Sequence, residues 1–106
     1  KTVYKGDWMN NEKTGKGKME MSIQTDHGGT YTGHFENGNR EGNGVIEFLD
    51  DKKYIGQWKN NVKHGFGMFI WPDGRQYIGE YKNNKREGYG EMIHPNGRRQ
   101  KGIWKN

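Results

Sequence analysis

Apolar and polar positions alternate along the chain, and the clearest stretch is YIGQWK at residues 54–59. A period of two is typical of a β-strand with one packed face and one solvated face. Residues 60–64 (NNVKH) are polar and rich in asparagine, which predicts a turn. Residues 65–71 (GFGMFIW) predict a second strand, and residues 72–75 (PDGR) predict a turn back. The pattern therefore predicts a β-hairpin, and the frequent glycines and β-formers disfavour helix.

This hairpin pattern recurs along the chain. A Y-x-G start followed by a G-x-G at a fixed offset predicts full units at 4–30, 31–53, 54–76 and 77–99, and a partial closing unit at 100–106. The first unit carries four extra residues around "SIQTDHGG", and Gln100 replaces the tyrosine of the last unit. The link "DDKK" at Asp50 lacks the glycine found in "PDGR". We expect one repeat domain made of four hairpins and a closing strand.

Alternation sorts each hairpin into two faces. One face of the third unit carries rings and glycines: Tyr54, Gly56, Trp58, Gly65, Gly67, Phe69 and Trp71. A glycine leaves a hole in a strand, and an aromatic ring from a neighbouring strand can lie flat across it. We expect the rings to fold down onto their own sheet, so that a single sheet makes its own core.

The units resemble the MORN repeat, a hairpin module with a Y-x-G-x-W start and a later G-x-G, and the resemblance runs from Tyr4 to Trp104. It implies an all-β fold in which the hairpins line up into a single elongated, twisted antiparallel sheet. The family is linked to membranes and to cytoskeletal and ciliary assemblies. Its repeats also occur as accessory segments beside catalytic domains, including lipid kinases and lysine methyltransferases.

Composition adds limits to this picture. The chain has 106 residues, of which 28% are hydrophobic and 13% aromatic, so we expect an ordered domain with a thin core. It has no cysteine, which fits a cytoplasmic location and excludes disulfides. The net charge of +5 makes anionic partners plausible.

Basic residues recur in the predicted hairpin loops, so we expect Lys13 and Arg40 to lie along one edge of the sheet. An anionic phospholipid surface is one possible partner of this edge, and a solvated loop edge is the alternative. The candidate phospholipid-binding residues are Lys59, Lys63, Lys82, Lys85 and Arg86. Nucleic acid is an unlikely partner, because the aromatic residues are committed to packing on glycine.

No residue pattern points to catalysis. The histidines are isolated, and the G-x-G motifs lie inside strands and lack a third glycine at dinucleotide spacing. Glu80 and Glu91 share a face of one hairpin, but exposed carboxylates on a sheet are common. We expect no catalytic residues, no cofactor and no metal, and therefore no enzyme activity.

The face opposite the rings is polar in the first two units and becomes apolar in the third and fourth. An exposed apolar patch of this kind usually marks an interaction site, although curvature or a flanking segment could also bury it. The predicted partner-binding residues are Ile55, Phe66, Met68, Ile70, Ile78, Tyr89 and Ile93. The partner would be a protein helix, an extended segment or a second copy of the chain.

The sequence therefore predicts a rod-like scaffold or adaptor module that mediates protein–protein interaction in a cytoplasmic, membrane-associated or cytoskeletal and ciliary setting. The alternatives are a membrane-targeting module that binds anionic phospholipid and an accessory segment of a larger enzyme.

Overall fold

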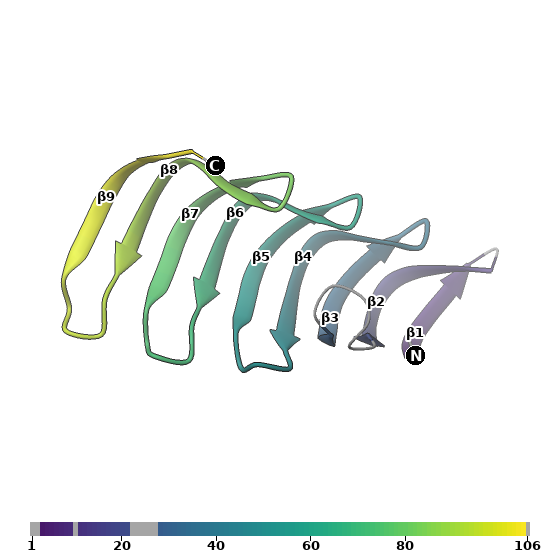
Figure 1. Cartoon of the computed structure of the whole chain (residues 1–106). Coiled ribbons are helices and arrows are strands. Elements are labelled where there is room, and N and C mark those ends of the chain that lie inside the picture. The colour runs from purple at the N-terminus through teal and green to yellow at the C-terminus, as the bar shows by residue number, and fades with distance from the viewer. Residues whose placement is uncertain (1–2, 10, 22–27, 106) are drawn as a thin grey trace.

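Nine β-strands follow one another in a single antiparallel sheet, in chain order. The computed structural model describes residues 3–9, 11–21 and 28–105, and it measures 47 × 24 × 20 Å. The strands are β1 (Val3–Met9), β2 (Glu12–Met21), β3 (Gly29–Glu36), β4 (Asn39–Phe48), β5 (Lys53–Lys59), β6 (Val62–Ile70), β7 (Gln76–Lys82), β8 (Lys85–Ile93) and β9 (Arg99–Trp104). Each strand is bowed, so the sheet forms an open trough (Figure 1). The predicted fold, four hairpins and a closing strand in one sheet, is confirmed.

Each described hairpin turns over two residues at its tip. Asn60 and Asn61 both have positive φ, at 49° and 70°, and Asn83 and Asn84 repeat this geometry. Such a turn matches the twist of the flanking strands, and asparagine tolerates the left-handed conformation. The second strand therefore starts at Val62, and the expected five-residue turn over 60–64 was wrong.

The first glycine of each G-x-G lies at a β-bulge. In the third unit Gly56 pairs with Gly67 while Trp58 pairs with Lys63, so three residues of β6 face the single residue Gln57. The Phe66 backbone N–H donates to Gln57 Oε1 over 2.8 Å. We had expected Gly65 to act as a packing hole like Gly67, but its φ of 91° shows that it supplies the left-handed backbone of the bulge.

In each full unit the motif tyrosine covers the second glycine of the G-x-G. A Cβ on Gly67 would collide with the Tyr54 ring, and the same holds for Gly44 under Tyr31 and Gly90 under Tyr77. The prediction that rings fold down onto glycines is thus confirmed. The source of the ring differs from the expectation: Tyr54 lies along its own strand and over its hairpin partner, and its hydroxyl donates to the Gln57 carbonyl over 2.9 Å.

The second ring of each motif packs on the tyrosines. Trp58 meets Tyr54 edge to face at 5.3 Å between centroids, and it meets Tyr31 of the preceding unit at 5.4 Å. Tyr81 meets Tyr54 at 5.1 Å in the same way. Edge-to-face contacts thus run from unit to unit along the core, which includes the fully buried Tyr31, Tyr54 and Tyr77.

The link turns at 48–52, 71–75 and 94–98 share one geometry. Residues 71–75 close with Trp71 N–H donating to the Arg75 carbonyl and Gly74 N–H donating to the Trp71 carbonyl, both over 3.0 Å. The link at 48–52 makes the same two bonds, and Asp51, with a φ of 71°, takes the place of the glycine. Most of the four-residue insertion expected in the first unit lies at 22–27, outside the described residues.

Candidate functional site

The bowed sheet has a concave face that carries the aromatic core and a convex face that carries the alternate residues. Side chains from both ends of the strands line one hollow of about 330 Å³ on the concave face: Asn61 and Asn84 come from hairpin turns, and Asp50 and Lys52 come from a link turn. We call this hollow the groove pocket. Its floor is apolar and includes Ile46, Phe48, Trp58 and Phe69.

A ladder of cations crosses the concave face at the position nine residues after each motif tyrosine: Lys13, Arg40, Lys63 and Arg86. The Arg40 guanidinium lies 4.7 Å from the centroid of the Trp58 ring, and only 6% of this residue is exposed. Lys63 Nζ lies 5.6 Å from the Tyr54 ring. These residues therefore do not lie along the solvated edge as predicted, because the strands begin earlier and carry them onto the aromatic face.

Asparagines of the next hairpin hold two members of this ladder, Arg40 and Lys63, in place. Asn61 Oδ1 accepts the Arg40 backbone N–H over 2.8 Å, and Asn84 Oδ1 accepts the Lys63 N–H over the same distance. Arg40 Nη2 also donates to the Asn61 carbonyl over 2.9 Å. The cations thus join neighbouring hairpins, which gives them a structural role.

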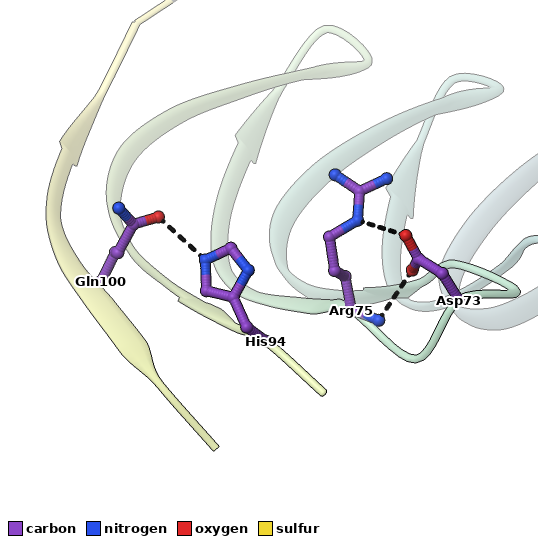
Figure 2. Close-up of polar contacts among 4 residues, drawn as sticks. All are labelled: Asp73, Arg75, His94 and Gln100. Carbon is purple, nitrogen blue, oxygen red and sulfur yellow. Dashed lines mark hydrogen bonds and ion pairs between the residues drawn. The ribbon is translucent and has the colours of Figure 1, made fainter. Parts of the chain in front are cut away.

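The groove pocket is shaped by a local difference between units. Phe48 and Lys52 border it, whereas the next link places Trp71 and Arg75 at the same positions. The Arg75 guanidinium lies over the Trp71 ring, 4.9 Å from its centroid. Arg75 also forms an ion pair with Asp73 at 2.8 Å (Figure 2). Sequence reasoning missed this pocket, although the basic residues Lys52 and Arg75, each two positions before a motif tyrosine, were a visible signal.

In the last unit the tyrosine position is polar. Gln100 contacts His94 Nε2 at 3.1 Å (Figure 2), and a Cβ on Gly102 would meet no atom within 4 Å. The replacement of tyrosine by glutamine therefore leaves this glycine uncovered.

Burial changes the acidity of the core tyrosines. Desolvation raises the pKa of Tyr31 to about 12, although Arg40 partly opposes it. The pKa values of Tyr54 and Tyr81 are raised for the same main reason. These phenols stay protonated at neutral pH, as Tyr31 and Tyr54 must to donate to backbone carbonyls.

The convex face carries a row of four apolar residues that are direct cross-strand neighbours, which we call the convex strip: Val45, Ile55, Met68 and Ile78. Ile55 is 38% exposed and Ile78 is 40% exposed. Phe66 and Ile70 flank Met68 along β6, and Phe66 is 62% exposed. Strip and flanks together form one apolar surface on the third and fourth units.

The predicted partner-binding residues do not all join this surface. Ile93 is separated from Ile70 by Gln76 in the register, and Tyr89 pairs with Ile103 near the C-terminal end of the sheet. The structure therefore brings together five of the seven residues, Ile55, Phe66, Met68, Ile70 and Ile78, and adds Val45.

Comparison with protein families identifies the repeat. The MORN repeat model matches residues 4–22, 31–51, 54–74 and 77–98, most of the chain. The chain belongs to the MORN repeat family. No curated protein matches it. MORN repeats are commonly modules of protein or membrane interaction.

The candidate phospholipid-binding residues divide between two places in the MORN sheet. Lys59, Lys82 and Lys85 are exposed beside the hairpin turns, whereas Lys63 and Arg86 are half-buried over rings of the groove. Of the five candidate cations, three therefore remain on the exposed edge that a membrane could contact.

Glu80 and Glu91, the two carboxylates expected to share a face of one MORN hairpin, each contact another group. Glu80 Oε1 accepts the Tyr89 N–H over 3.4 Å, and Glu91 forms an ion pair with Arg99 at 3.1 Å. Within residues 3–9, 11–21 and 28–105, no three His, Cys, Asp or Glu side chains are grouped as metal ligands. The same part of the chain contains no helix able to span a membrane.

Proposed function

We propose that this chain is a non-catalytic scaffold or adaptor module whose convex face binds a protein partner. The observation that carries the proposal is the convex strip with Phe66, because these apolar residues lie in register on the face that the core does not use. Exposed apolar patches on soluble domains usually mark interaction sites. The elongated sheet would display this patch within a cytoplasmic, membrane-associated or cytoskeletal assembly.

Two other functions compete with this one. Anionic phospholipid would contact the exposed lysines at the hairpin edge, and an accessory role would place the sheet beside a catalytic domain. The inward position of Lys63 and Arg86 argues for the protein partner over the lipid.

The test is a comparison of two double variants in the full chain. Phe66→Ser with Ile78→Ser removes exposed apolar side chains from the patch, and Leu49→Ser with Ile103→Ser removes apolar side chains outside it that are at least as exposed. Proteins from an extract of cells that naturally contain the chain should cross-link to the second variant but not to the first. Thermal unfolding checks that both variants fold. Equal capture by both variants would overturn the proposal.

A further inference from the structure

The convex strip has the dimensions of a helix contact. Strands lie about 4.8 Å apart, so the three gaps from Val45 to Ile78 span about 14 Å. Across the strip, Phe66 to Ile70 is four residues of strand, about 13 Å. An α-helix is about 10 Å wide, and its apolar positions recur about every 5 Å along the axis, close to the strand spacing.

An extended segment fits this surface poorly. The strip runs across the face of the sheet, where strands β4 to β7 already pair with one another on both sides. A strand laid there would bury its own N–H and C=O groups without partners, whereas a helix satisfies its backbone internally. The face therefore selects a helical partner over an extended one.

A second copy of the chain also fits poorly. The row of the strip continues through Thr32 to Lys18 and Lys5 at one end, and through Glu91 to Lys101 at the other. A two-fold axis through the centre of the strip would lay Ile55 on Met68 and Val45 on Ile78, but it would also set Lys18 against Lys101. Like charges set against each other oppose that packing.

The charges at the two ends of this row would also favour one orientation of a helix bound on the strip. Lys5 and Lys18 are direct cross-strand partners, so their charges add at one end of the row. Glu91 follows Ile78 at the other end. The carbonyl end of a helix carries partial negative charge and is favoured near cations.

We propose that the convex strip docks one amphipathic helix of about three turns, laid across β4 to β7 with its C-terminal end toward Lys18. This inference rests on the proposed function and specifies its partner. Met68 lies at the centre, flanked by Phe66 and Ile70 along its own strand.

The experiment selects binders without assuming their structure. Random peptides displayed on phage are selected on the immobilised full chain, and their affinities are then measured for Met68→Ser and for Met9→Ser, the same substitution at an exposed methionine outside the strip. Phe66→Ser provides a second strip variant should Met68→Ser fail to fold. We expect the selected peptides to lose at least about tenfold in affinity for the strip variants but not for Met9→Ser, as at an interface hot spot. Their apolar residues should lie three and four positions apart. Their circular dichroism should be helical when they are bound.

Direction is tested with the selected peptides. Lys18→Glu should weaken binding about two- to fivefold at low salt, whereas Lys101→Glu should not weaken it. Equal effects of the two reversals would overturn the orientation.

Strip-dependent peptides with alternating apolar residues would overturn the helix, as would the recovery of no strip-dependent peptide. A dimer of the wild-type chain that Met68→Ser abolishes would assign the strip to a second copy. In each case the proposed function is judged separately, by the cross-linking test with Phe66→Ser and Ile78→Ser. Loss of the cross-linked partner in that double variant would support the proposed function, and unchanged capture would overturn it.

Discussion

Tyr54 and Ile55 are neighbours in one strand and belong to surfaces with different constraints. Tyr54 is fully buried over glycine, and the equivalent residue of every described full unit is also tyrosine. Ile55 is 38% exposed, and its equivalents are Lys5, Thr32 and Ile78. The concave face therefore repeats because the fold depends on it, while the convex face varies from unit to unit.

The largest effect should come from filling a glycine on the concave face. Gly67→Val places a side chain where the Tyr54 ring lies, so it should reduce the free energy of unfolding by about 3 kcal/mol despite the better β-propensity of valine. Urea unfolding measures this loss. Met68→Val, one residue along on the convex face, is the control, with an expected change below about 1.5 kcal/mol. An unchanged midpoint for Gly67→Val would contradict the packing of rings on glycines.

High pH should weaken the concave face next. Burial raises the pKa of Tyr31 from 10.0 to about 12, so the unfolded chain releases its proton first as pH rises through this window. Stability should fall with rising pH by about 2–3 kcal/mol for this residue. Chemical unfolding between pH 9 and 12 measures the fall, and Tyr31→Phe should make it smaller. A fall of the same size in the variant would show that Tyr31 is not the cause.

A smaller loss is expected at the asparagines that join hairpins. Asn61→Gly keeps the left-handed turn but removes the acceptor of the Arg40 N–H, so it should cost about 1 kcal/mol. Asn60→Gly, in the same turn, is the control and should change stability by only a few tenths of a kcal/mol. Thermal unfolding compares the stabilities of the two variants. Equal losses of stability would show that the effect comes from turn flexibility and not from the lost hydrogen bond.

The smallest effect should come from the exposed lysines of the hairpin edge. Changing Lys59, Lys82 and Lys85 together to Glu should alter stability by less than about 0.5 kcal/mol per site, because exposed charges contribute little. Flotation with vesicles that contain or lack phosphatidylserine then tests the lipid alternative. Salt-sensitive flotation that only the wild type shows would favour a membrane surface over the protein partner.

Much of the fold could be predicted because the spacing of aromatic residues and glycines has a local cause. The Tyr54 ring reaches Gly56 in its own strand and Gly67 directly opposite, so the repeat alone predicts a one-layer core. The polar-to-apolar switch on the convex face was likewise visible, because it needs only the period of two.

The groove was harder to predict because it depends on small local choices and on curvature. Two asparagines in left-handed conformation shorten the turn, and this carries Lys63 from a predicted loop onto the rings. The bowing of the strands then brings Lys52 and Asn61, from opposite ends of the strands, to one hollow. The asparagine pair marks the turn in the sequence, but the bowing is not marked by a distinctive residue.

The division between the two faces is tested most directly by one substitution made at two adjacent residues. Tyr54→Thr and Ile55→Thr remove side chains from opposite faces of β5, and Thr32 shows that threonine is accepted at the convex position. Urea unfolding should show a loss of about 3 kcal/mol or more for Tyr54→Thr and less than about 1 kcal/mol for Ile55→Thr. Losses of similar size at the two positions would contradict the account, because the convex face would then be part of the core.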